Sequence, residues 1–303
     1  MNGMAARTAA REMGRQRRLA AAQHVLARVV VYAAAVCAAL VCAAPFLWGL
    51  VTAFAAGSPH AGGGPTTRHV RFLLHSTPFT TFARNTLVVG VLVVILTLAL
   101  ALPAAYALSR LDRSWAPRMR MAVALVSLVP PSLLFLSLSR VVATLGLADS
   151  IWSLVLVYPT VTVPVSVWLL SGFLRAVPVD LEEQAMVDGH SRLGAFVRVV
   201  APLVLPGVAA VVVLTFTLAA GEFTYALTFV WSSPRMPVST GLPARLGAAD
   251  PLLWRSVQSG AVFVAVPLAV ACGLFLDRFV AALAVRPDPA PRAGHVDRSS
   301  LRG

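Results

Sequence analysis

Charged residues are scarce in this sequence of 303 residues: Asp, Glu, Lys and Arg together make up 12% of it, and Lys is absent. Soluble domains carry roughly 25% charged residues, whereas the mean hydropathy of this chain is +0.80. Because so few charged side chains cannot cover a water-facing surface, the composition excludes a soluble enzyme and a disordered chain. It indicates a membrane protein.

Cysteine is also rare. Cys37, Cys42 and Cys272 lie in apolar stretches, with no Cys-x-x-Cys pair and no His at ligand spacing, which argues against a disulfide framework and a structural zinc site. The six His show no paired spacing typical of metal binding. The phosphate-binding pattern GxxxxGK[ST] is absent as well. We therefore expect no metal, no cofactor and no catalytic residue in this chain.

Six apolar segments are each close to the length that crosses a hydrocarbon core of about 30 Å. A bilayer offers no water to backbone N–H and C=O groups, so these segments should be helices, and the alternating pattern of a membrane β-barrel is absent. We predict an all-α fold, a polytopic membrane protein with six transmembrane helices. The predicted spans comprise residues 29–54, 86–109, 121–139, 151–174, 207–231 and 257–276.

Arg is distributed unevenly about these spans. Six alternating crossings place 18 of the 25 Arg on the side of the two termini and 7 on the other side. Because the excess of positive charge marks the cytoplasmic side, we predict a cell-membrane protein with both termini in the cytoplasm. The net charge of +13 then reflects topology and contact with membrane lipid, with no nucleic-acid partner.

The same topology predicts three regions. A basic cytoplasmic tail occupies residues 1–28, the membrane domain residues 29–285, and a second cytoplasmic tail residues 286–303. The last region is rich in Pro, Gly, Ser and charge without a periodic apolar face, so we expect it to be disordered.

The longest predicted cytoplasmic connection, residues 175–206, has the signals of two short helices joined by a corner. Asp180, with Glu183 three residues later, fits a capping box at the start of the first helix. Gly189 can adopt the positive φ that ends this helix, and Ser191 can cap the second one. Pro202 and Pro206 are expected to end the second helix and lead into the fifth span.

The first of these helices also has a small apolar face. Ala185, Met186 and Val187 follow its acidic first turn, and such a face suits docking into a groove of another protein. A solvated amphipathic loop is the alternative.

The spacing within residues 175–206 resembles the EAA loop of ABC-importer permeases. That loop has Glu-Ala-Ala, three residues, Gly, nine residues and then Ile-x-Leu-Pro. The matching positions are Glu183, Gln184, Ala185, Gly189, Val199 and Pro202, with departures at Gln184, Val199 and Ala201. Weaker likenesses to the carbohydrate branch of this family, in particular its MalG-like second permeases, cover most of residues 45–285.

The resemblance implies a type I ABC-importer permease fold and a division of labour. In that family two permeases form the pore, cytoplasmic ATPase subunits hydrolyse ATP, and an extracytoplasmic solute-binding protein delivers the solute. This chain would therefore be no enzyme itself, and its small polar solute would be a sugar or a related carbohydrate. The residues expected to couple it to the ATPase are Glu183, Gln184, Ala185, Asp188, Gly189 and Pro202.

Glu222 is the one acid inside a predicted span, where burial is costly unless the side chain faces a cavity or a partner. Tyr225 and Thr228 continue from it at helical spacing, and together the three residues are candidates for the wall of a solute path. A structural hydrogen bond to another helix is the alternative reading. An ion-coupled secondary transporter that uses Glu222 as its proton site is the alternative function.

Overall fold

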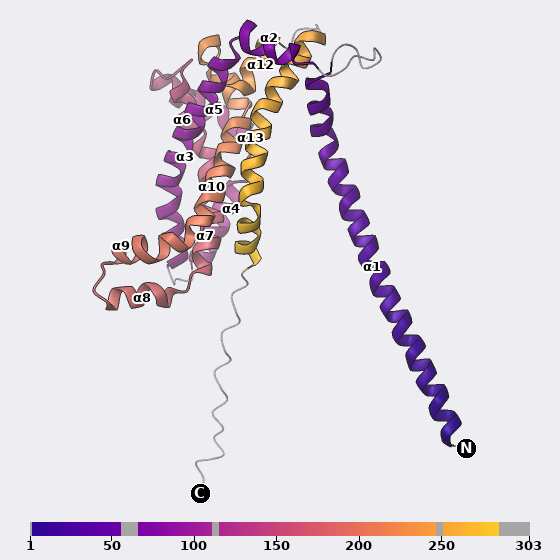
Figure 1. The fold of residues 1–303 in the computed structure, drawn as a ribbon. Helices are drawn as coiled ribbons and strands as arrows, with labels where there is room; N and C mark the ends of the chain where they lie inside the picture. Colours follow the sequence, from indigo (N-terminus) through magenta and orange to yellow (C-terminus); the bar gives the residue numbers. More distant parts are fainter. Residues whose placement is uncertain (1, 56–65, 111–114, 247–250, 285–303) are drawn as a thin grey trace. The chain divides into compact units, whose positions relative to one another are not determined.

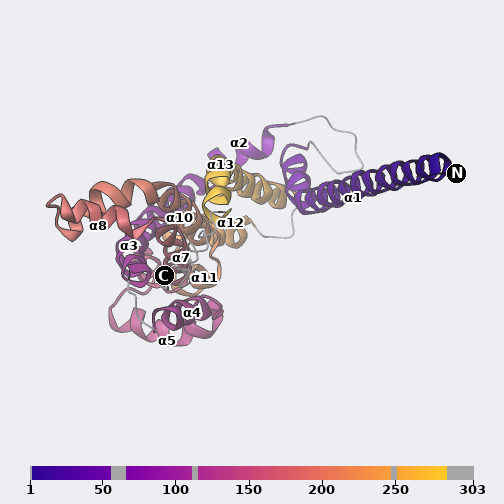
Figure 2. The ribbon, with the colours of Figure 1, turned by 90° about the horizontal axis from the view of Figure 1, so that it is seen from below.

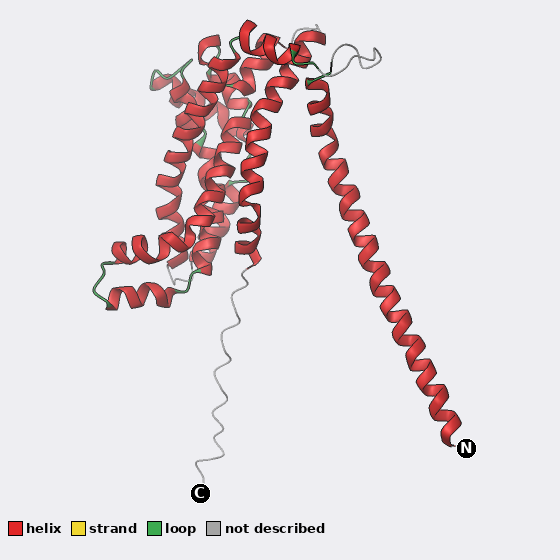
Figure 3. Cartoon of the chain, viewed as in Figure 1, coloured by secondary structure: helices red, strands yellow, loops and turns green. Residues whose placement is uncertain are grey.

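The computed structural model describes residues 2–55, 66–110, 115–246 and 251–284, and its elements in these ranges are all helices (Figure 3). The all-α prediction is confirmed. The chain divides into two units, Met1–Arg68 and His69–Gly303, each of which is considered by itself. The tail predicted to be disordered, residues 286–303, lies outside the described residues.

The first unit consists mainly of one long helix, α1 (Asn2–Ala53) (Figure 1). Its apolar part, Arg28–Ala53, has 26 residues, enough to cross a bilayer. The helix runs without a break through the predicted basic tail and the predicted first span.

Four further helices of membrane-spanning length belong to the second unit. They are α3 (Phe79–Arg110), the stretch Ile151–Ala176, the stretch Arg192–Gly221, and Trp254–Leu274 within α13 (Pro251–Ala284). The second stretch contains α6 (Ile151–Val157) and α7 (Pro159–Ala176), and the third contains α9 (Arg192–Ala195), the π-helix η1 (Phe196–Val200) and α10 (Ala201–Gly221). Helix α3 packs against α7 and α10, and α10 also packs against α13.

The predicted span 121–139 is sharply bent in the structure. Helices α4 (Ala116–Val126) and α5 (Pro131–Thr144) meet at an angle of 87°. Pro130 and Pro131 lie at the break, and because proline has no backbone N–H and restricts the residue before it, a straight helix cannot pass this point. The described residues thus hold five helices of spanning length, or six if the bent pair crosses the membrane as one span.

The predicted span 207–231 is also interrupted, because α10 ends at Gly221 and a new short helix, α11 (Thr224–Phe229), follows. The remaining short elements are α2 (Arg68–Ser76), α8 (Val179–Val187), the 3₁₀ turn η2 (Ser233–Arg235) and α12 (Val238–Leu246). Helix α8 projects sideways from α3, α7 and α10 (Figure 2).

Two clusters of buried apolar side chains hold the second unit together. One surrounds Phe82, Tyr158 and Tyr225, and the other, nearer to α8, includes Leu170 and Val200. The second cluster depends on a close approach of α10 to α7. A Cβ atom at Gly207 would lie 2.4 Å from the ring of Phe173, so only glycine fits there without displacing that ring.

Candidate functional site

Residues 178–195 form a compact helical hairpin, in which α8 and α9 are joined by a tight turn. The turn closes the end of α8 with two hydrogen bonds, from Gly189 N to Met186 O (3.1 Å) and from His190 N to Ala185 O (3.1 Å). Gly189 has φ of +90°, as predicted, and this is the left-handed conformation that the Schellman motif requires. The corner of the hairpin is therefore fixed by the backbone itself.

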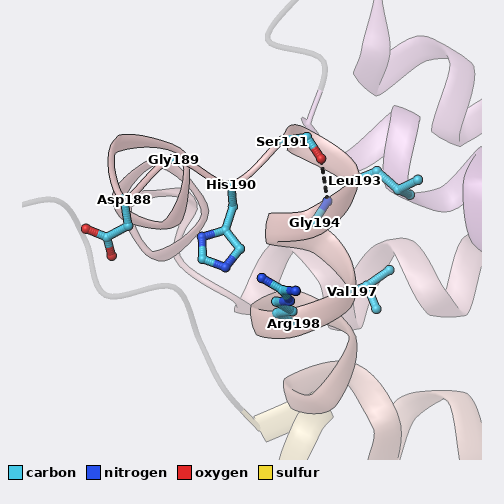
Figure 4. A pocket seen from close by; sticks show the side chains of 8 residues that line it. All are labelled: Asp188, Gly189, His190, Ser191, Leu193, Gly194, Val197 and Arg198. Carbon is cyan, nitrogen blue, oxygen red and sulfur yellow. Dashed lines mark hydrogen bonds between the residues drawn. The ribbon is translucent and has the colours of Figure 1, made fainter.

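The second helix of the hairpin begins as the sequence predicted. The side chain of Ser191 accepts a hydrogen bond from Gly194 N at 3.1 Å, which satisfies one of the free N–H groups of the first turn (Figure 4). The predicted end at Pro202 and Pro206 is wrong, because the helix continues through both prolines to Gly221. Pro202 lies in the first turn of α10, directly after η1, where Ala201 N donates to Phe196 O. This wider π turn accommodates the missing N–H of the proline.

The predicted capping box at the start of α8 is also wrong. Pro178 occupies the N-cap position, and no side chain caps this helix. The helix begins as soon as the chain leaves the extended backbone of Pro178, so Asp180 is already in the first turn. There it still interacts favourably with the positive end of the helix dipole.

Glu182 anchors the hairpin to the membrane helices, a role that the sequence did not reveal. Its side chain is buried, and its carboxylate accepts hydrogen bonds from Arg110 Nε, at 2.8 Å, and from the hydroxyl of Tyr106. Arg110 Nη1 also donates to the carbonyl oxygens of Leu174 and Val177, both at 3.2 Å. One buried ion pair thus connects α8 to the end of α3 and to the end of α7.

Five of the six predicted coupling residues lie on this hairpin, and the sixth, Pro202, lies beyond it. Glu183, Gln184, Asp188 and Gly189 are exposed. Ala185 is buried against the rest of the protein, with 7% of its surface exposed, so it does not belong to an outer apolar face. Pro202 is distant in sequence from the corner and forms the start of α10.

Val187 is exposed, as the predicted apolar face requires, and it shares this face with Leu193 of α9 and with Val197 of η1, which directly follows the hairpin; the three are 87%, 72% and 56% exposed. Beside them lies a groove of about 460 Å³. It is lined by Asp188, Gly189, His190, Ser191, Leu193, Gly194, Val197 and Arg198 (Figure 4). Such an exposed apolar patch with a polar rim is typical of a protein interaction site.

The three residues predicted to line a solute path do not form one helical stripe, because α10 ends at Gly221 and α11, which holds Tyr225 and Thr228, begins only at Thr224, after Glu222. The carboxylate of Glu222 accepts hydrogen bonds from Thr224 N (2.9 Å), Tyr225 N (2.8 Å) and Ala226 N (3.3 Å), so it caps α11. Tyr225 is fully buried. The hydroxyl of Thr228 donates to Thr224 O at 2.7 Å.

Asp149 fastens the loops at the other end of the stretch Ile151–Ala176. Its carboxylate accepts hydrogen bonds from Trp231 N (3.0 Å) and Ser232 N (2.8 Å) and from the Ser232 hydroxyl, and it pairs with Arg235 Nη1 at 3.1 Å. Burial alone would raise the pKa of Asp149, but these hydrogen bonds and the positive charge of Arg235 outweigh burial, so its pKa lies below the usual 3.8. No local sequence pattern marks this role of Asp149.

The loop that contains Asp149's partners is also tied to α3. The side chain of Asn85 donates to Pro234 O (2.8 Å) and Met236 O (3.1 Å), and Val238 N donates to the hydroxyl of Thr86 (2.8 Å). Both ends of the bundle are therefore held by polar side chains at the ends of long apolar helices. Within the ranges that the structure describes, no group of three or more His, Cys, Asp or Glu is placed to hold a metal ion.

These features define a multi-pass membrane protein with a rigid helical hairpin at one end of its bundle. Comparison with known families gives a specific assignment. Residues 98–288 match the family of binding-protein-dependent transport system inner membrane components, and the chain belongs to this family.

Curated relatives extend the match over most of the chain. The chain is 30% identical over 268 residues to the trehalose/maltose transport system permease protein MalG of Thermococcus litoralis. The aligned region covers 86% of this chain and 96% of that protein. It is 32% identical over 226 residues to the sulfoquinovosyl glycerol transport system permease protein SmoH of Agrobacterium fabrum, covering 74% and 78% of the two chains.

A solved structure shares the fold. A chain of the bacterial ABC transporter involved in the import of the acidic polysaccharide alginate superposes with a TM-score of 0.67 at 18% identity, over 83% of this chain and 95% of that one. The type I importer fold expected from the EAA-like spacing is confirmed.

Proposed function

We propose that this chain is the permease subunit of an ATP-driven importer for a sugar or a related carbohydrate. The family assignment supports the importer, and the relatives named above support the class of solute. The same assignment favours an ATP-driven importer over an ion-coupled carrier. In the structure the carboxylate of Glu222 serves as a helix cap rather than as an isolated proton site.

The hairpin of α8 and α9 is the proposed coupling element, and the observation that carries this proposal is the buried pair of Glu182 and Arg110. Exposed Val187 and Leu193 would dock into a cleft of the ATPase subunit. Closure of the ATPase on ATP would then move the hairpin as one body, because Gly189 and its hydrogen bonds fix the corner.

Motion of the hairpin has two routes into the membrane. One is the ion pair from Glu182 to Arg110, which leads to α3 and α7. The other is the continuous helix from Arg192 to Gly221, in which Pro202 begins α10. Together they would shift the bundle between inward-open and outward-open states.

Each predicted coupling residue has a place in this scheme. Glu183, Gln184 and Asp188 are exposed and would meet polar groups of the ATPase, with Glu183 pairing a basic side chain. Ala185 would act from within, because its small side chain lets α8 pack closely.

We further propose that both termini and the hairpin are cytoplasmic, on the basis of the unequal distribution of Arg. The partners would be ATPase subunits, a second permease, and an extracytoplasmic solute-binding protein. ATP hydrolysis would take place in the ATPase, consistent with the absence of GxxxxGK[ST] from this sequence. Glu222, Tyr225 and Thr228 stay candidates for the solute path.

The test is reconstitution of this chain in lipid vesicles with the ATPase, second permease and binding protein encoded by neighbouring genes. Maltose and trehalose are the first trial solutes. Solute uptake that requires ATP on the side of the membrane where the ATPase lies, and that persists without a proton gradient, supports the proposal. Uptake that needs a proton gradient and no ATPase contradicts it.

A further inference from the structure

A second cavity, of about 510 Å³, lies on the inner side of the hairpin, between α8 and the ends of α3, α4 and α7. Its volume falls in the range of small-molecule sites, roughly 300–1,000 Å³. Its charged lining residues are Arg110, Arg120, Arg175, Arg192, Glu182 and Glu183. It shares no lining residue with the groove beside Leu193 and Val197.

Positive charge exceeds negative charge around this cavity. Among the described residues, its one ion pair joins Arg110 to Glu182. Arg120 Nη1 donates to Leu108 O (2.8 Å), and Arg175 Nε donates to Ser171 O (3.2 Å), but these acceptors are neutral. Four guanidinium groups thus share two carboxylates, and like charges this close repel one another unless an anion lies between them.

Arg110 itself has an unused donor. Its side chain is only 10% exposed, and its Nη2 atom is buried with no hydrogen-bond partner among the described residues. A buried charged donor without an acceptor is costly, and folded proteins rarely keep one. Because Arg110 lines the cavity, an acceptor bound there would remove this cost.

We propose that this cavity binds the phosphate group of an anionic ligand. The planar guanidinium group matches phosphate oxygens with two parallel hydrogen bonds, and several Arg from different helices are the usual means of holding such a group. A bound phosphate would join α3, α7 and α9 through Arg110, Arg175 and Arg192, and so brace the hairpin against the membrane helices.

The position of the cavity defines two sources of the phosphate. Arg110 is the last residue of the spanning helix Phe79–Arg110, and Arg175 is next to last in Ile151–Ala176. This is the level at which phospholipid headgroups lie, and basic pockets between helix ends bind anionic headgroups. A small phosphate compound from solution has the same chemistry.

The test compares two double variants of the full chain in detergent, each of which removes two Arg. Arg175→Gln/Arg192→Gln removes exposed lining residues that make no described hydrogen bond to another helix. Arg118→Gln/Arg198→Gln removes exposed Arg that do not line the cavity, so it controls for general loss of charge. Circular dichroism and gel filtration confirm that both variants fold.

Native mass spectrometry then measures binding of phosphatidylglycerol and of phosphatidylcholine, and calorimetry measures binding of inorganic phosphate to the delipidated chain. We expect the cavity variant to bind phosphatidylglycerol about 10- to 30-fold more weakly than wild type, with the control unchanged. Loss of inorganic phosphate binding in the cavity variant instead identifies a soluble source. The proposal is overturned if the two double variants change binding of these ligands to the same extent. It is also overturned if wild type binds phosphatidylglycerol and phosphatidylcholine equally well and binds no inorganic phosphate.

Discussion

The carboxylate of Glu182 and the guanidinium of Arg110 form an ion pair at 2.8 Å, although 72 positions separate them in the sequence. Both side chains are nearly enclosed, with 5% and 10% of their surfaces exposed. The neighbouring acid, Glu183, is exposed on the same helix. Two adjacent acids of α8 thus have different tasks, one inside the protein and one on its surface.

Replacing each acid separately will distinguish these tasks. Glu182→Gln leaves Arg110 buried without its counterion, and we expect a loss of about 3 kcal/mol in stability, because breaking a buried pair is strongly destabilising. Glu183→Gln removes an exposed charge and should change stability by less than about 0.5 kcal/mol. Thermal unfolding of the purified chain, followed by tryptophan fluorescence, measures both.

The same two variants separate anchoring from docking in the reconstituted transporter. Glu183→Gln should leave the chain stable and lower solute uptake per ATP hydrolysed. The double exchange Glu182→Arg/Arg110→Glu restores opposite charges and should recover part of the stability that either single reversal loses. No recovery, with both single reversals as stable as wild type, would mean that the pair does not anchor the hairpin.

Gly189 is the second point at which the hairpin depends on a single residue. Its φ of +90° strains any residue with a Cβ, so Gly189→Ala should destabilise the corner by about 1–2 kcal/mol and lower coupled transport. Gly172→Ala is the control, because Gly172 lies within α7 and an added Cβ would have no atom of another part of the protein within 4 Å. Protection of the amide of His190 from hydrogen exchange should fall in the first variant only.

The exposed apolar face that includes Val187 is the part of the hairpin proposed to dock into the ATPase. Val187 is 87% exposed, so Val187→Ser should leave stability unchanged, yet it should weaken co-purification of the ATPase subunit roughly tenfold. Leu145→Ser is the control, since Leu145 is also an exposed apolar residue, at 57%, and it follows α5, outside the hairpin. Equal retention of the ATPase by Val187→Ser and wild type would place the contact elsewhere.

Part of this site was predictable because its signals are local. Gly189 and Ser191 end and begin helices through contacts within five residues, and the structure confirms both. The start of α8 was misplaced because Asp180 has the right side chain for a cap, but Pro178 already turns the chain into the helix. Local signals compete there, and the sequence does not say which one prevails.

The inward orientation of Glu182 was not predictable in this way. It depends on the rotation of α8 about its axis, which places Tyr106 and Arg110 on one side of the helix and solvent on the other. Apolar length likewise predicted the position of the fifth span but not its end at Gly221. The carboxylate of Glu222 accepts hydrogen bonds from three backbone N–H groups and so stabilises the start of a new helix there. The hydropathy of the sequence is insensitive to such a cap.

The negative charge of Asp149 makes the stability of this protein depend on pH. It has φ of +53°, a conformation that Asn also tolerates, so Asp149→Asn removes the charge without straining the backbone. In wild type the pKa of Asp149 is held below its usual 3.8 by hydrogen bonds from Ser232 and Trp231 and by Arg235, against the opposing effect of burial. A carboxyl group whose pKa is lowered in the folded state stabilises the protein at pH values above its usual pKa. This contribution is lost as the pH falls through the folded-state pKa.

We therefore expect the difference in unfolding temperature between wild type and Asp149→Asn to be constant from about pH 7 to pH 5 and to shrink below about pH 4. At neutral pH the variant should be less stable by about 1–3 kcal/mol, because a charged acceptor of several hydrogen bonds is lost. Asp188→Asn, at an exposed position on the hairpin, is the matched control and should follow wild type across this range. A difference for Asp149→Asn that stays constant down to pH 3 would show that the negative charge of this residue does not fasten the loops, and that its hydrogen-bonding shape alone does.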